Sequence, residues 1–249
     1  MKQLLILTSF FLCLACSRKE NLVVELNPTD VEMVIQQMTD VMIHDVTNPP
    51  LAARFFAYSC LAANEVIALH DTTIMSMYGK LNEFPNIKIP KGGTEINKDI
   101  AALLAMYETA KVLQPSGKLM GDFEDKWIDS LLKKGVSKEV MDQSHALAKE
   151  VSLQIVKYAK ADKYNQISAL PRYTPKKEEG TWYPTPPGYF PPVEPHFNTI
   201  RSFTLERADQ FKPEPPIPFS ADKKAPFYTL MNEIKELSLD DKKKEIAAF

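Results

Sequence analysis

Apolar residues between positions 28 and 163 recur at intervals of three and four, the repeat of a helix that buries one face. The first such run extends from Val31 to Met42, and Thr29 or Asp30 is its expected N-cap. No stretch of this region alternates apolar and polar side chains convincingly, as a half-buried strand would. The pattern therefore predicts an all-α helical bundle over residues 28–163, with further helices over residues 51–70, 96–113, 118–134 and 137–161.

Residues 51–70 differ from the other predicted helices because they are apolar on most sides and rich in small side chains. This composition predicts a central helix around which the neighbouring helices pack closely. Glu65 is the carboxylate that we expect to be buried there. We interpret it as paired with Arg54 or Arg201 rather than as a catalytic group. Glu65 and Arg201 are also candidates to line a pocket.

The pattern changes at residue 164, where proline and aromatic residues replace the helical repeat. Twelve of the nineteen prolines lie between Pro171 and Pro218, interleaved with Trp, Tyr and Phe. Disordered linkers are poor in aromatic residues, so residues 164–220 are predicted to form an irregular arm wrapped over the helices. The alternative, a polyproline ligand for a partner domain, would leave the rings in water. His196 in this arm either lines the mouth of a pocket or is a buried histidine held by one hydrogen bond.

Both ends of the chain carry further signals. Lys2 and the apolar run after it resemble a lipoprotein signal peptide over residues 1–15, too short to span a membrane. Cys16 would then be the lipidated N-terminus of an exported protein, held in the cell envelope by a tether over residues 16–27. The alternative is an ordinary secretory signal. Over residues 221–249 we expect helices, the last capped by Ser238 and interrupted at Phe249 without a stop signal.

Charge and motif content exclude several classes of function. The net charge of −2 and the absence of a basic stripe argue against a nucleic-acid groove. No HExxH, CxxC, nucleophile elbow or phosphate-binding glycine loop occurs. His44 and His70 each close a predicted helix, and His145 lies on an apparently polar face with no ligand four residues away. With Cys16 lipidated, Cys60 has no partner and is expected to be a buried, inert thiol. No catalytic, cofactor-binding or metal-binding residue is therefore predicted.

Several longer motifs resemble a known family. They include PRYTP at 171–175, GTWYPTPPGY at 180–189, VEPHFNTIR at 193–201 and ADQFKP at 208–213. Upstream, PPLAAR at 49–54, YSCLAANE at 58–65 and GKLN at 79–82 are similar to the same group. This group is the bacterial PAP2-superfamily proteins related to vanadium-dependent haloperoxidases, and the likeness covers nearly the whole chain after the signal peptide.

The resemblance implies a helical fold that holds vanadate or phosphate, with peroxide-driven halide oxidation or phosphomonoester hydrolysis as its chemistry. The family's anion site uses a Lys and an Arg-Pro six residues apart, a Pro-Ser-Gly-His turn, and a later Ser-Arg followed by His. None of the three motifs is present. The nearest match, residues 115–118, ends in Lys118 where the family has His, and we interpret it as a helix connector. Vanadate is therefore expected only where a further, C-terminal half is present.

Two hypotheses follow. In the first, the chain is the N-terminal part of a membrane-anchored haloperoxidase or phosphatase relative, inactive without its C-terminal half. In the second, it is a stand-alone, non-catalytic surface lipoprotein that acts as a binding module. A homo-oligomer partner is compatible with either, and the motifs do not separate halide oxidation from phosphate hydrolysis.

Overall fold

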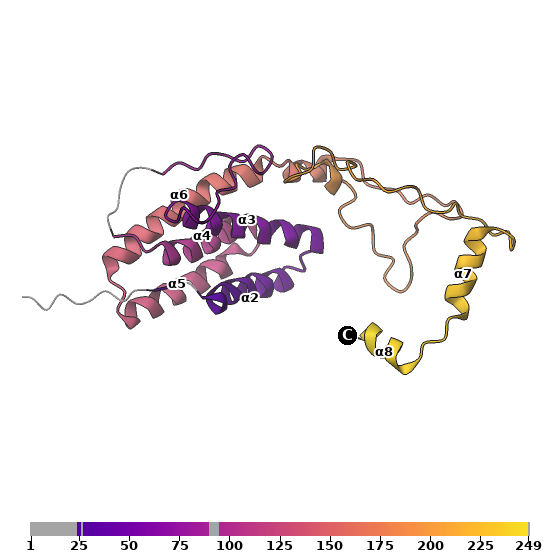
Figure 1. The fold of residues 1–249 in the computed structure, drawn as a ribbon, viewed down its shortest axis with the longest axis horizontal. Coiled ribbons are helices and arrows are strands. Elements are labelled where there is room, and N and C mark those ends of the chain that lie inside the picture. The colour runs from indigo at the N-terminus through magenta and orange to yellow at the C-terminus, as the bar shows by residue number, and fades with distance from the viewer. Residues whose placement is uncertain (1–23, 26, 90–94, 249) are drawn as a thin grey trace, which may run out of the picture. The chain divides into compact units, whose positions relative to one another are not determined.

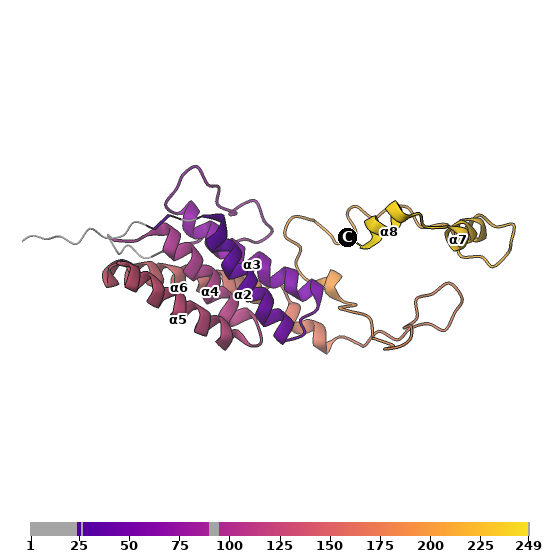
Figure 2. The same cartoon turned by 90° about the horizontal axis from the view of Figure 1, so that it is seen from below.

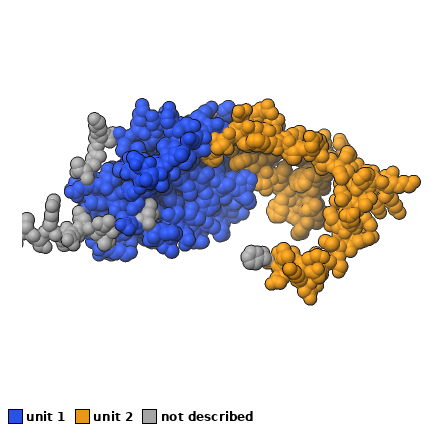
Figure 3. Space-filling view, viewed as in Figure 1, with its two compact units in different colours: residues 1–165 blue, residues 166–249 orange. Residues whose placement is uncertain are grey.

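The computed structural model describes residues 24–25, 27–89 and 95–248 and confirms the all-α class, because these residues contain helices and no strand. Two compact units make up the chain, residues 1–165 and residues 166–249, which Figure 3 distinguishes by colour. In chain order the elements are α2 (Pro28–His44), α3 (Pro49–Ala68), α4 (Lys98–Leu113), α5 (Gly117–Lys134), α6 (Lys138–Lys160), the 3-10 turns η1 (Tyr164–Ala169) and η2 (Phe197–Thr199), α7 (Pro226–Glu236) and α8 (Asp241–Ala248).

Unit 1 is a bundle of the five helices α2 to α6, which pack side by side in both views (Figures 1 and 2). Its central helix is α4, in which every residue from Ile100 to Ala110 is buried. The prediction that residues 51–70 form the central helix is therefore wrong. The helix α3, which covers residues 49–68, packs against α4 and α6 but keeps an open side.

Polar caps set the helix starts. Asn27, not Thr29 or Asp30, caps α2: its side chain accepts a hydrogen bond from the Asp30 backbone N–H, and the Asp30 carboxylate accepts one from the Asn27 N–H. At α8, the Asp240 carboxylate accepts from the Lys243 N–H at 2.8 Å, so Ser238 is not the cap. Both corrections move the helix start within the same run of capping residues, so they leave the fold unchanged.

A buried ion pair joins α3 to the end of α6. The guanidinium of Arg54 donates from Nε to Asp162 Oδ2 at 2.5 Å and from Nη2 to the carbonyl of Ala159 at 2.8 Å. Asp162 also accepts from the Tyr58 hydroxyl at 2.9 Å and from the Tyr164 backbone N–H at 2.9 Å. Because the Arg54 Nε, the Tyr58 hydroxyl and the Tyr164 N–H converge on one buried carboxylate, its charge is both paired and hydrogen-bonded.

Unit 2 lacks a core of this kind. None of its described residues, 166–248, is buried. Its ring contacts are between exposed or half-buried side chains: the Tyr173 and Trp182 rings lie 6.2 Å apart, and the Phe219 and Phe227 rings 5.2 Å apart. Phe190 and Phe211 are each 78% exposed. Contacts within unit 2 do not cover these rings, and their coverage by the bundle stays a prediction.

Candidate functional site

The strongest concentration of buried charge in the described bundle lies between α4, α5 and α6. Glu108 comes from α4, Glu124 from α5 and His145 from α6. The Nε2 atom of His145 lies 2.7 Å from Glu108 Oε1 and 3.2 Å from Glu124 Oε1. Lys111 Nζ lies 2.5 Å from Glu124 Oε2 and 3.0 Å from Glu108 Oε1. We call these four residues the charge cluster.

Each group of the charge cluster stabilises the charged form of its partners. Hydrogen bonds to Glu108 and Glu124 raise the pKa of His145 to about 9, so the imidazole is protonated at neutral pH. Burial alone would raise the pKa of Glu108, but the hydrogen bonds from His145 and Lys111 lower it overall. Burial would lower the pKa of Lys111, and the two carboxylates raise it instead. Two anions are thus balanced by two cations inside the protein.

This balance decides which ligands the charge cluster can hold. The ligand atoms of His145, Glu108 and Glu124 lie within 4.8 Å of one another, a spacing that suits a metal ion. A metal, however, would have to displace both the Lys111 ammonium and the His145 proton. Vanadate fits less well, because an oxyanion needs surrounding cations and here it would meet two carboxylates. The charge cluster is therefore a self-neutralised link between three helices and does not fit vanadate.

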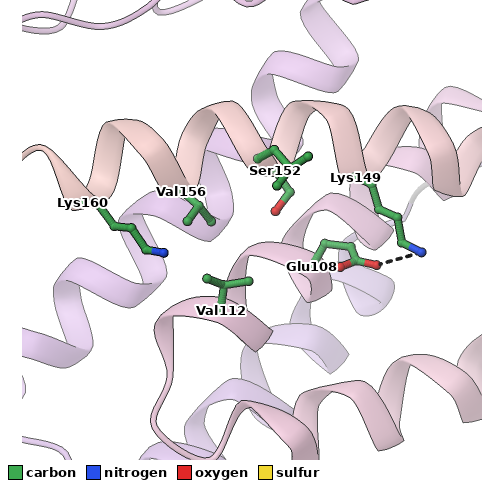
Figure 4. A pocket seen from close by; sticks show the side chains of 7 residues that line it. Glu108, Val112, Lys149, Ser152, Val156 and Lys160 are labelled. Atoms are coloured by element: carbon green, nitrogen blue, oxygen red, sulfur yellow. Dashed lines mark ion pairs between the residues drawn. The ribbon is translucent and has the colours of Figure 1, made fainter.

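A pocket of about 290 Å³ opens next to the charge cluster, between α4 and α6 (Figure 4). Glu108 belongs to both, and Lys149 lies 3.8 Å from its carboxylate, the ion pair that is dashed in the figure. The remaining lining is mostly apolar: Val112, Ser152, Leu153, Val156 and Lys160. Its one carboxylate is already paired, so the pocket offers an apolar surface between two lysines and no convergent set of catalytic groups.

The structure places Glu65 at a buried position, as predicted, but with other partners. Its carboxylate accepts from Ser76 Oγ at 2.7 Å and from the Met77 backbone N–H at 2.7 Å. Arg54 is engaged by Asp162, so the predicted pair between Arg54 and Glu65 is wrong. Glu65 therefore fixes the chain that follows α3 to that helix. Its pairing with Arg201 stays a prediction, because Arg201 belongs to unit 2.

The other candidate in the arm, His196, is half-buried and precedes η2. Its Nε2 lies 2.7 Å from the carbonyl oxygen of Pro171, which agrees with the alternative of one hydrogen bond, but the side chain is half-buried and not buried as that alternative expected. The pocket between α4 and α6 is lined by unit 1 alone, so His196 takes no part in it. The geometry supports a structural role for His196 within unit 2.

The turn at residues 115–118 connects α4 to α5, as predicted. The Ser116 backbone N–H and hydroxyl both donate to the Asp45 carboxylate, at 3.0 and 2.5 Å. A Cβ on Gly117 would lie 1.9 Å from the carbonyl oxygen of Lys111, so glycine is required by close packing. Lys118 points to solvent and pairs with Asp122. The contacts of this turn therefore stabilise the bundle and do not form an anion site.

Two sequence predictions about cysteine have different outcomes. Cys60 is exposed on α3, so the prediction of a buried thiol is wrong. It faces away from α4 and α6, on the side of α3 that neither helix covers. The lipidation site Cys16 and the chain end Phe249 lie outside the described residues, so both remain predictions.

Sequence reasoning missed the charge cluster, and in particular placed His145 on a polar face. The residues come from three helices, and no spacing along the chain connects them. One kind of signal was available: Glu124 follows the apolar Met120 by one helical turn, and Glu108 comes directly after the largely apolar run from Ile100 to Tyr107. A charged residue at a core position predicts a buried partner, even though it does not identify that partner.

No model of a known protein family matches the chain, and no curated protein matches it. Among solved structures, the chain is similar to a bacterial vanadium-dependent iodoperoxidase, with a TM-score of 0.81 and 32% sequence identity. The match covers 87% of this chain and 52% of the iodoperoxidase, so the chain spans about half the length of that protein.

Unit 1 ends at residue 165 of 249, so a match to 87% of the chain must extend well into unit 2. The likeness therefore includes the irregular arm as well as the helical bundle. Agreement in both fold and sequence over this length makes the chain a relative of the vanadium-dependent haloperoxidases, as its motifs predicted.

Proposed function

We propose that this chain is the N-terminal part of an exported, membrane-anchored relative of the vanadium-dependent haloperoxidases. In this proposal the residues that bind the anion belong to a part of the fold that the chain does not contain. One observation carries the proposal: the match uses 87% of this chain but only 52% of the iodoperoxidase. The bundle and arm would then form a scaffold, and the chain alone would be inactive.

The charges of the bundle support the proposal that the anion-binding residues lie in another part of the fold. A site for vanadate or phosphate needs several cations that are free to face the anion, with an imidazole beside them. In the described residues of unit 1, the buried cations already face carboxylates: Arg54 faces Asp162, and Lys111 and His145 face Glu108 and Glu124. An oxyanion would have to break these pairs to bind, at a cost that exposed cations would not impose.

The alternative, a non-catalytic surface lipoprotein, draws its support from unit 2. Phe190 and Phe211 are open, and a binding module uses aromatic side chains of this kind to contact a partner. The first proposal accounts for the same rings by contact with the rest of the haloperoxidase fold. It also accounts for the match that extends through the arm, so we prefer it.

The test is an assay of the purified chain with vanadate, peroxide and iodide or bromide, and separately with p-nitrophenyl phosphate. We expect no turnover above blank and no stoichiometric binding of orthovanadate by calorimetry. The matched control is the iodoperoxidase, assayed whole and truncated to the part that aligns with this chain. The whole enzyme should be active and the truncated one inactive. Turnover by this chain, or tight one-to-one capture of vanadate, would overturn the proposal.

A further inference from the structure

The helix α3 has two unlike faces. One face is buried against the bundle and contains Phe55, Tyr58, Ser59, Ala62, Glu65 and Val66. On the opposite face Ala53 and Cys60 are exposed and Ala57, Asn64 and Ile67 are half-buried, and these five residues recur at helical spacing. Phe56, on one edge of this side, packs against the core and is not counted with them. We call this second set the α3 outer face. It carries no charged side chain, because Arg54 and Glu65, the charged residues of α3, are bound within unit 1.

An uncharged outer face is unusual for a surface helix, which normally carries charged and polar residues on the side away from the core. The neighbouring helices follow that rule. Lys118 and Asp122 form an exposed ion pair on α5, and Lys138 and Asp142 form one on α6. The helix α3 as a whole is apolar for one that is open on one side, because its 18-residue window has a mean hydropathy of 1.2 and 33% of that window is buried.

A bilayer is the other environment that suits such a helix, because α3 is long and apolar enough to cross a membrane. Its inner face argues against a span. Arg54 and Tyr58 bind Asp162, and Glu65 binds the Met77 backbone, so α3 is fixed to the bundle by buried polar contacts. A helix held in this way is a core helix that lacks a cover on one side.

We propose that the α3 outer face is the docking surface for a helix from the part of the haloperoxidase fold that this chain does not span. The inference rests on the proposed function and names the surface that the absent part would use. Almost half of the iodoperoxidase lies outside the match, so the fold has chain available to cover α3. The bundle elements that this chain does contain leave the face open at Ala53 and Cys60.

The side chains of the face specify the kind of occupant. Ala53, Ala57 and Cys60 are small, so a second helix could approach this face closely, at the lower end of the usual 8–10 Å between axes. The Asn64 amide already donates to the Met75 carbonyl oxygen at 3.1 Å, so it requires no polar partner. The occupant is therefore an apolar helix whose larger side chains pack over these small ones.

Cys60 lies in the middle of the face and provides the test. The chain contains three cysteines, so replacing Cys13 and Cys16 by serine leaves Cys60 as its one thiol. The experiment compares this full chain with a chimera in which it is followed by the unmatched part of the iodoperoxidase, stripped of other cysteines. Partial burial already raises the pKa of the Cys60 thiol, so the two proteins are compared with each other. Maleimide labelling of Cys60 should be at least about tenfold slower in the chimera than in the chain alone, because a fully buried thiol reacts only on opening.

Substitutions separate docking from misfolding. Cys60→Glu should leave the thermal midpoint of the chain alone nearly unchanged and lower that of the chimera by several degrees, because it would bury an unpaired charge. The matched control is Leu153→Glu on α6, which changes an exposed apolar residue away from the face. That control should affect the chain and the chimera equally.

Each other result overturns the inference. Fast labelling in the chimera would show that the face stays open. Slow labelling in the dilute chain alone would show that the arm covers it, and slowing only at high concentration would identify a second copy as the occupant. Slower labelling in the presence of phosphatidylglycerol vesicles, without protection in the chimera, would identify the bilayer as the occupant.

Vanadate-dependent turnover of the chimera is a second measurement, independent of the labelling of Cys60. An active chimera with an open Cys60 refutes the docking surface alone, whereas an inactive chimera with a protected Cys60 refutes the proposed function alone.

Discussion

Unit 1 buries carboxylates and cations together from four helices, whereas unit 2 buries none of its described residues. The Arg54–Asp162 pair and the charge cluster connect α3, α4, α5 and α6 with contacts that this chain supplies itself. Unit 2 has ring contacts and turns but no interior. The match to the iodoperoxidase nevertheless extends into unit 2.

The conformations of the two units are therefore determined in different ways. The bundle can select its own arrangement, because leaving any one of its buried charges unpaired is costly. The arm takes part in the match to a larger protein. A segment without buried apolar surface, however, gains little free energy from ordering by itself. The comparison therefore predicts that disruptive substitutions act strongly in unit 1 and weakly in unit 2.

The largest effect is expected from Arg54→Ala. The substitution leaves the Asp162 carboxylate buried without its cation, and losing one partner of a buried pair costs about 3–5 kcal/mol. Thermal or urea unfolding followed by circular dichroism measures the loss. The control in the other unit is Phe211→Ser, which removes an exposed ring and should change the free energy of unfolding by less than about 0.5 kcal/mol. Equal effects of the two substitutions would contradict the comparison.

A smaller loss of stability is expected when His145 in the charge cluster loses its proton. Because the pKa of His145 is raised to about 9 from its ordinary value of 6.5, its contribution is fully present below pH 6.5 and is lost as the pH rises through 9. The loss should be on the order of 2–3 kcal/mol. Urea unfolding at pH 6 and at pH 10 measures it, and the variant His145→Gln should show a much smaller decrease over this interval. An unchanged pH dependence in that variant would exclude His145 as its source.

The sequence predicted the regular part of the fold well. Helical repeats and apolar runs located the five helices α2 to α6 along the chain. The prediction of which helix is central was wrong. Small residues suggested residues 51–70, whereas α4 is the helix that is enclosed on all sides. Small side chains permit close packing, but they do not say whether the partner is present in the same chain.

The candidate site was less accessible from sequence. Glu65 was correctly expected to be buried, yet its partners are a serine hydroxyl and a backbone amide in the following loop, which no spacing rule identifies. The charge cluster joins residues up to 37 positions apart along the chain, and only the packing of three helices brings them together. Pairing of buried charges depends on tertiary geometry, whereas helix periodicity depends on neighbours along the chain.

Amide hydrogen exchange of the monomeric, purified chain tests the comparison most directly. Amides in α4 should exchange only through global unfolding, whereas amides in residues 171–220 should exchange near the rate of an unprotected chain. This pattern would show that the bundle is stable by itself and that the arm depends on contacts that the chain does not supply. Protection of the arm equal to that of α4 would contradict the account, because it would mean that this chain already covers its own proline- and aromatic-rich segment.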